Sequence, residues 1–272
     1  MKPYYKTDNC ALYQCDNLDL LKSLPDNYID LIYCDVLYGT GKDFEDYQDL
    51  PANRTIIDAH YHPRFKEMHR VLKNIGVIYI HCDYHISHWV RIILDEVFEC
   101  CNFRNEIIWR YRKWGIKSND FQKMHNTIFR YSKSKVLTWN QLYEERAKST
   151  QKAFGNKKIN TTFKKTGEKI LESTSEKSLG SKMSDVWDIS YIQGSCAKER
   201  ERGGKYKTQK PVELLKRIIE SSSNLKDIVA DFYMGSCTTG EVAVELGRKF
   251  IGCDIGDNAC KISKERIENI IE

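Results

Sequence analysis

The sequence has no apolar run long enough to span a bilayer, and no positively charged start followed by an apolar stretch and a cleavage site. These absences predict a cytoplasmic protein without membrane contact. Histidines occur in small groups, but none has a matching cysteine pair at zinc-site spacing, so we predict no metal centre. The ten cysteines lie in apolar runs or beside one another, which indicates reduced, buried thiols rather than disulfides.

Two glycine-rich fingerprints are also missing. A strand-like segment near the carboxyl terminus runs into a loop at residues 235–240, and this loop contains neither G-x-G-x-x-G nor G-x-x-x-x-G-K-[ST]. The first absence argues against a dinucleotide-dependent dehydrogenase. The second excludes a phosphate-cradling P-loop.

The length and the distribution of charge predict the domain organisation. A chain of 272 residues can form one large α/β domain, or one domain with an insertion. The net charge of +5 is mild, but lysines greatly outnumber acids between Arg146 and Lys182. We therefore expect one domain over residues 1–272 with a basic, partly flexible insertion at residues 133–184. Such a block suits a polyanion, although a solvated lysine-rich loop is its ordinary explanation.

The amino-terminal half contains a strand-like run that ends in an acid. Residues 29–34 are mostly apolar and β-prone, and they lead into Asp35, Val36, Leu37 and Tyr38 before two glycines end the extended stretch. Ligands of open α/β sheets bind outside the carboxyl ends of the strands, so this strand is placed to deliver side chains to a site. Taken alone, the run is more simply a strand that ends in an acid and a turn.

The carboxyl-terminal half repeats this arrangement around the glycine loop. A helix opens near Pro211, a buried strand covers residues 227–234, and the loop leads into a further helix. The next strand ends at Asp254, and an amphipathic helix closes the chain. This order is typical of a nucleotide-type cofactor site, in which glycine lets the backbone approach the ligand and Asp254 accepts hydrogen bonds from ribose hydroxyls.

Aromatic and basic residues alternate in the middle of the chain. Residues 107–114 and 128–131 interleave the two kinds, as a nucleic-acid groove does when rings stack on bases and cations neutralise phosphates. Two ordinary strands with an aromatic inner face and a charged outer face would give the same pattern. Our candidates for nucleic-acid contacts are Arg110, Arg112, Lys113 and Trp114.

Four motifs in a fixed order carry a resemblance to a known family. DVLY at residue 35 resembles D-P-P-Y, residues 121–134 resemble a mid-chain motif, TQKP at residue 208 resembles a Q-K-P segment, and DFYMGSCTTG at residue 231 resembles D-P-F-x-G-S-G-T-T. The chain is thus similar to the beta class of DNA amino-methyltransferases. These enzymes methylate adenine N6 or cytosine N4 with S-adenosyl-L-methionine. The catalytic motif precedes the cofactor motif, as in the permuted arrangement of that class.

The resemblance implies both a fold and a site. The fold is a doubly wound, Rossmann-like sheet of the AdoMet-dependent methyltransferase type, with target recognition in the inserted segment. The implied catalytic motif comprises Asp35, Val36, Leu37 and Tyr38. The implied pocket for S-adenosyl-L-methionine is lined by Asp35, Lys210, Asp231, Gly235, Ser236, Thr239 and Asp254.

The chain departs from the family motifs at four positions. Val36 and Leu37 replace both prolines of the catalytic motif, and Phe232 replaces the proline after Asp231. Without a preset φ, ordering of the loop costs about 1 kcal/mol more per position. Cys237 replaces the glycine before the threonine pair. A side chain there is strained if the position needs a positive φ, and cofactor affinity would then fall.

The resemblance also implies a mechanism. The target base leaves the duplex because its amino group cannot be reached while it is stacked and paired. Tyr38 stacks on the flipped ring, while the Asp35 carboxylate and the Val36 carbonyl accept hydrogen bonds from the amino group and free its lone pair. Methyl transfer is then a direct in-line displacement that needs no cysteine nucleophile. By resemblance, Asp rather than Ser at position 35 favours adenine.

Alternatives remain open. An inactive, DNA-binding relative would bind DNA and transfer no methyl, and an N4-cytosine, RNA or protein methyltransferase could use the same fold. The partners expected with the first interpretation are duplex DNA, a second copy of the chain in a homodimer and a companion restriction endonuclease.

Overall fold

The computed structural model describes residues 1–44, 46–113, 115, 117, 119–164, 166, 168–192, 206 and 208–271. The chain divides into two compact units, one of residues 1–140 with 185–272 and one of residues 141–184. Within the described residues, no helix combines the length and the apolar character needed to cross a membrane.

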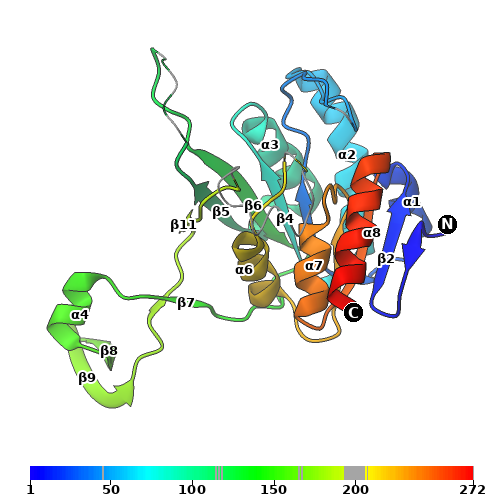
Figure 1. Ribbon diagram of the computed structural model, residues 1–272. Helices are drawn as coiled ribbons and strands as arrows, with labels where there is room; N and C mark the ends of the chain where they lie inside the picture. Colours follow the sequence, from blue (N-terminus) through cyan, green and yellow to red (C-terminus); the bar gives the residue numbers. More distant parts are fainter. Residues whose placement is uncertain are drawn as a thin grey trace. The chain divides into compact units, whose positions relative to one another are not determined.

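A nine-stranded sheet forms the centre of the larger unit (Figure 1). Its order is β1-β2-β13-β12-β3-β4-β6-β5-β11. The run from β2 to β4 is parallel, β6 is antiparallel to both its neighbours, and β11 is parallel to β5. The strands are β1 (Tyr5–Lys6), β2 (Cys10–Gln14), β3 (Ile29–Asp35), β4 (Leu72–Cys82), β5 (Phe103–Arg110), β6 (His125–Ser132), β11 (Val186–Asp188), β12 (Ile228–Asp231) and β13 (Lys249–Asp254).

Helices cover both faces of this sheet, which confirms the predicted doubly wound α/β architecture. Apolar side chains of α1, α2 and α3 share one hydrophobic core with β3, β4 and β6. On the opposite face, the Tyr79 hydroxyl of β4 lies 2.7 Å from the Ser222 hydroxyl of α6. The helices are α1 (Asn17–Ser23), α2 (Arg54–Val71), α3 (Ser87–Phe98), α6 (Val212–Ser222), α7 (Thr238–Glu245) and α8 (Asp257–Ile271), with a 3₁₀ turn at Cys100–Asn102.

Local sequence explains how several of these elements begin and pair. The Asp16 carboxylate caps α1 by accepting a hydrogen bond of 2.7 Å from Leu18 N, and Asn53 caps α2 in the same way. Asp30 is the one acid within the apolar run of β3, and its buried carboxylate pairs with Lys73 Nζ at 2.8 Å. All described cysteines are free thiols, as predicted, but Cys100 and Cys101 are exposed rather than buried.

The smaller unit comprises two antiparallel pairs of strands and a helix. β7 (Tyr143–Glu144) pairs with β10 (Ser181–Lys182), and β8 (Lys157–Phe163) pairs with β9 (Lys169–Lys177), both antiparallel. The helix α4 (Lys148–Phe154) buries none of its residues. Residues 133–140, which we expected in the insertion, belong to the larger unit, where Asn140 Nδ2 donates to the Glu220 and Ser223 carbonyls at 3.0 and 2.9 Å. The role of residues 133–184 in target recognition stays a prediction.

Candidate functional site

Asp35 is the last residue of β3 and stands at the carboxyl edge of the parallel strands. The backbone after it is held on both sides. Val36 N donates to the His81 carbonyl at 3.0 Å, and the Tyr61 hydroxyl donates to the Leu37 carbonyl at 2.8 Å. Proline at position 36 has no N–H and could not donate to the His81 carbonyl. In this chain a backbone hydrogen bond therefore orders the motif, whereas the family uses the rigid proline ring.

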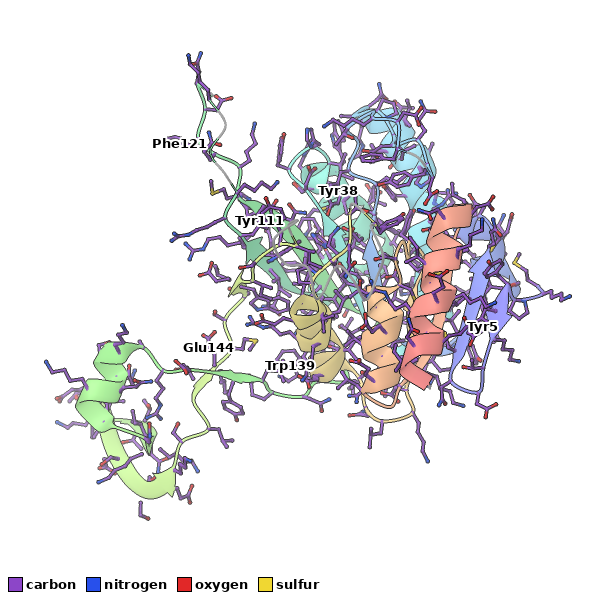
Figure 2. The ribbon with its side chains drawn as sticks, viewed as in Figure 1. Tyr5, Tyr38, Tyr111, Phe121, Trp139 and Glu144 are labelled. Carbon is purple, nitrogen blue, oxygen red and sulfur yellow. The ribbon has the colours of Figure 1, made fainter. Side chains whose placement is uncertain are left out.

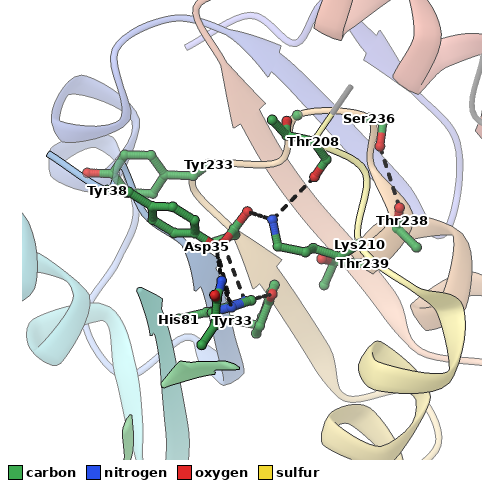
Figure 3. Close-up of polar contacts among 12 residues, drawn as sticks. Tyr33, Asp35, Tyr38, His81, Thr208, Lys210, Tyr233, Ser236, Thr238 and Thr239 are labelled. Carbon is green, nitrogen blue, oxygen red and sulfur yellow. Dashed lines mark hydrogen bonds and ion pairs between the residues drawn. The ribbon is translucent and has the colours of Figure 1, made fainter. Parts of the chain in front are cut away.

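The two carboxylate oxygens of Asp35 have different partners (Figure 3). The Tyr38 hydroxyl donates to Oδ1 at 2.7 Å, and Lys210 Nζ forms an ion pair with Oδ2. Lys210 Nζ also donates to the Thr208 carbonyl at 3.2 Å and lies 5.6 Å from the centre of the Tyr38 ring. The TQKP segment therefore brings a cation directly to the acid of the DVLY motif.

His81 lies beside Asp35 because the two residues are paired in the register of β3 and β4. Its Nδ1 is 2.9 Å from the Tyr33 hydroxyl and 3.3 Å from Asp35 Oδ1. Burial lowers the pKa of His81 to about 3, so the ring is neutral at physiological pH. From the sequence, His81 was only one member of a small histidine group that did not match a metal site. Its place next to Asp35 follows from the sheet order, which the sequence did not reveal.

Asp231 ends β12, and its carboxylate is buried at the start of the glycine loop. The Thr239 hydroxyl donates to Oδ2 at 2.6 Å, and Tyr233 N donates to Oδ1 at 3.0 Å. Burial outweighs these bonds and raises the pKa of Asp231 to about 7. The group is thus poised to change charge near neutral pH.

Gly235 and Asp254 fix the opposite side of the loop. Gly235 N donates to Asp254 Oδ2 at 3.0 Å, and Gly256 N donates to Oδ1 at 2.9 Å. Gly235 has a φ of +48°, and a Cβ there would lie 3.1 Å from the Tyr206 ring. Glycine adopts this positive φ without strain, and a side chain here would also crowd the Tyr206 ring. Burial raises the pKa of Asp254.

One cavity within the larger unit joins these groups. All the catalytic and cofactor-binding candidates line it, namely Asp35, Val36, Leu37, Tyr38, Lys210, Asp231, Gly235, Ser236, Thr239 and Asp254. Segments from both halves of the sequence thus meet at the carboxyl ends of β3 and β12, where an open α/β sheet binds ligands. The roles of the individual residues stay predictions.

The cavity wall also contains a network of polar side chains around Arg64 that the sequence did not predict. Arg64 of α2 is 9% exposed and donates to Asn17 Oδ1 at 2.6 Å and to Asp16 Oδ2 at 2.7 Å. Asn17 in turn donates to the Phe232 carbonyl at 3.0 Å, next to Asp231. This network ties α1 and α2 to the loop, and no local pattern in the sequence marks it.

The candidates for DNA contacts differ in their surroundings. The Arg110 guanidinium pairs with both carboxylate oxygens of Asp188, so its charge is already matched within the protein. Arg112 is exposed. Lys113 Nζ lies 4.8 Å from the centre of the Tyr111 ring, and desolvation lowers its pKa. Trp114 lies outside the described residues.

Three side chains away from the cavity could approach a metal ion. Ligand atoms of Asp58, His62 and Glu96 lie within 4.8 Å of one another among the described residues. His62 Nδ1 is 3.8 Å from Asp58 and 3.7 Å from Glu96. The carboxylates are 41% and 51% exposed and belong to surface ion pairs, so the group does not alter the account of the cavity.

Cys237, which stands where the family has glycine, adopts the left-handed conformation with φ 59° and ψ 33°. Its buried Sγ packs over Gly240, where an added Cβ would lie 2.4 Å away. Cys237→Gly should therefore be about 1 kcal/mol more stable to unfolding than Cys237→Ala, since glycine alone adopts this conformation without strain. Urea denaturation of both variants measures the difference. Equal stability, or a more stable alanine variant, would refute the strain at this position.

Comparisons with known proteins agree with this geometry. Residues 29–265 match the family described as DNA methylase, N6_N4_Mtase. "DNA adenine methyltransferase YhdJ" of Escherichia coli (strain K12) is 30% identical over 257 residues, which are 93% of this chain and 81% of that protein. Several further relatives with similar identity are named type II methyltransferases.

Two solved structures share the fold. The cytosine-N4-specific PvuII DNA methyltransferase superposes with a TM-score of 0.66 at 18% identity, over 99% of this chain and 93% of that one. The M1.HpyAVI–SAM complex gives a TM-score of 0.59 at 19% identity, over 95% and 98% of the two chains. At these identities the likeness concerns the fold alone, and it confirms the predicted AdoMet-dependent methyltransferase type of sheet.

Proposed function

Because the chain belongs to the DNA methylase family that acts on amino groups of bases, we propose that it transfers a methyl group from S-adenosyl-L-methionine to adenine N6 in duplex DNA. The observation that carries the proposal is the cavity in which Asp35, Tyr38 and Lys210 face the loop of Asp231 and Gly235. It offers hydrogen-bond acceptors and a stacking ring beside a cradle for a cationic cofactor.

The residues around the loop fit S-adenosyl-L-methionine. Because Gly235 has no side chain, the Tyr206 ring can pack against the loop, where an added Cβ would lie 3.1 Å from the ring, and both residues line the cavity. Asp254 retains lone pairs for ribose hydroxyls in addition to its two backbone bonds. The Asp231 carboxylate offers a negative charge to a cationic ligand. When bound, the cofactor supplies an electrophilic methyl group on a positively charged sulfur.

The catalytic motif prepares the target amino group. Asp35 and the Val36 carbonyl accept its hydrogen bonds and draw it toward tetrahedral geometry, which frees the nitrogen lone pair. Tyr38 stacks on the flipped ring. Since no covalent intermediate with the protein is needed, position and orientation supply most of the rate enhancement.

Adenine is our choice of target base, and N4-cytosine is the second candidate. Asp35 in the catalytic motif and the name of the Escherichia coli relative favour adenine. The fold is shared with a cytosine-N4-specific enzyme, so the fold does not favour either base. Arg112, Lys113 and the basic segment at residues 133–184 would contact the duplex. A homodimer, a companion restriction endonuclease and a cytoplasmic location stay predictions.

Identification of the methylated nucleoside tests this proposal. The chain is incubated with tritiated S-adenosyl-L-methionine and equal masses of unmethylated duplex DNA and RNA, and the products are digested and separated. Label in N6-methyladenine from DNA supports the proposal. Label in N4-methylcytosine or in RNA would replace the proposed target, whereas DNA binding without any label would indicate an inactive relative.

Cofactor affinity should depend on pH through Asp231. Its pKa of about 7 makes the carboxyl largely neutral at pH 6 and ionised at pH 8. A cationic cofactor prefers the ionised form, so the dissociation constant should fall about tenfold over this interval. Asp231→Asn should show no such change. Calorimetric titration at the two pH values measures the effect, and an equal dissociation constant at pH 6 and pH 8 for the unaltered chain would contradict it.

A further inference from the structure

We propose that Asn126 is a specificity-determining residue whose amide donates a hydrogen bond to the ring nitrogen beside the target amino group. That atom is N1 of adenine or N3 of cytosine. The inference rests on the proposed function and deepens it, since it names a second contact to the base. Asp35 accepts a hydrogen bond from the target amino group, and Asn126 donates one to the ring nitrogen next to it.

A tyrosine hydroxyl links these two side chains in the ligand-free protein. Tyr38 Oη donates to Asp35 Oδ1 at 2.7 Å and accepts from Asn126 Nδ2 at 2.9 Å. The direction follows from the chemistry, because a carboxylate can only accept and the hydroxyl has a single hydrogen. Asn126 must therefore present its donor, the NH₂ group, to the site.

The surroundings of Asn126 hold the amide in this orientation. The Tyr111 hydroxyl donates to Asn126 Oδ1 at 2.7 Å, which fixes the carbonyl end (Tyr38 and Tyr111 are labelled in Figure 2). The second hydrogen of Nδ2 faces His81 Nε2 at 3.0 Å. A neutral His81 accepts there, in keeping with its low pKa, whereas a charged ring would oppose two donors. The amide is 93% buried, so rotation would leave polar atoms unpaired.

The Tyr38 hydroxyl thus has the same hydrogen-bonding pattern as the edge of an amino base. Adenine and cytosine both present an amino donor beside a ring-nitrogen acceptor on the Watson–Crick edge. Guanine and thymine present a carbonyl beside an N–H at the corresponding positions, which reverses the pattern. When Tyr38 moves to stack on the ring, the base can replace its hydroxyl between Asp35 and Asn126. Enzymes that flip bases commonly read this edge.

A base that lacks the ring nitrogen tests the contact directly. An unmethylated duplex that contains the sequence methylated by this protein is prepared with adenine or with 1-deazaadenine at the target position. In 1-deazaadenine, C–H replaces N1. Single-turnover methyl transfer is measured for the unaltered chain and for Asn126→Ala. If the product is N4-methylcytosine, 3-deazacytosine takes the place of 1-deazaadenine.

The ratio of rates on the two bases decides the outcome. Beyond the change due to the intrinsic reactivity of the analogue, the rate of methyl transfer to 1-deazaadenine should fall about tenfold for the unaltered chain and less than twofold for Asn126→Ala. That intrinsic reactivity affects both proteins equally, so it cancels when their rate ratios are compared. Tyr111→Phe, which removes only the hydroxyl that orients the amide, should give an intermediate ratio and serves also if the alanine variant does not fold. 3-Deazaadenine, altered on the far side of the ring, should show no coupling to either substitution.

Equal ratios for the unaltered chain and both variants would overturn the inference, because a merely supporting asparagine would slow both bases alike. This result differs from failure of the proposed function, in which the unaltered chain would methylate no base and the inference would fall with it.

Discussion

Asp35→Ala is expected to lower the turnover number for methyl transfer to DNA by about a thousandfold. The substitution removes the carboxylate that we propose as acceptor for the target amino group. In the unaltered chain the Lys210 ammonium pairs with Asp35. The substitution removes this anion and leaves the ammonium unpaired beside a cofactor that is itself cationic. Steady-state assays with saturating DNA and S-adenosyl-L-methionine measure the loss.

Two further variants separate chemistry from binding. Asp35→Asn keeps the size of the side chain but replaces one acceptor with a donor, so it should lose about a hundredfold and leave the KM for DNA within a few-fold. Asp58→Asn, on the surface of α2, is the matched control and should stay within twofold of the unaltered chain. Retention of more than a tenth of the activity by Asp35→Ala would remove Asp35 from the mechanism.

Glu241→Gln should lower the free energy of unfolding by about 3–5 kcal/mol and the melting temperature by about 10 °C. Glu241 of α7 forms an ion pair with Arg266 of α8, and the two side chains are 3% and 1% exposed. A neutral glutamine would leave a buried guanidinium without its counter-charge. Thermal and urea denaturation of the variant measure the cost.

Two controls test whether burial is the cause. Glu213→Gln breaks an ion pair between the same residue types on the surface of α6, where Glu213 is 59% exposed, and should cost less than about 0.5 kcal/mol. Replacement of both Glu241 and Arg266 with leucine and methionine should recover most of the loss, because no unpaired charge remains. A loss below about 1 kcal/mol for Glu241→Gln would contradict the buried pair.

The elements that are marked by a local pattern of residues could be predicted from the sequence. The apolar run of β3 leads to Asp35, and the glycine loop between β12 and α7 lies where composition placed it. The boundaries differ by a few residues, since β12 ends at Asp231 rather than at Met234. The residues after Asp231 leave the sheet because the glycine loop begins to turn there, with Tyr233 N bonded to the Asp231 side chain.

The contacts that the sequence did not reveal join side chains from distant strands. His81, Asn126 and Tyr111 converge only because β6 lies antiparallel between β4 and β5. No spacing along the chain encodes that order. Similarly, no local pattern places Arg64 in the cavity wall, since its partners Asp16 and Asn17 belong to the start of α1. The motifs marked the acids, and the sheet order supplied the groups that orient them.

Transfer of labelled methyl groups from S-adenosyl-L-methionine to unmethylated duplex DNA tests the central claim most directly. The claim is that the altered motifs, DVLY at residue 35 and DFYMGSCTTG at residue 231, still form a working site. We expect the unaltered chain to produce labelled N6-methyladenine and Asp35→Ala to produce none above background. If the unaltered chain binds DNA and cofactor but transfers no label to any base, the chain is not an active methyltransferase and the account is wrong.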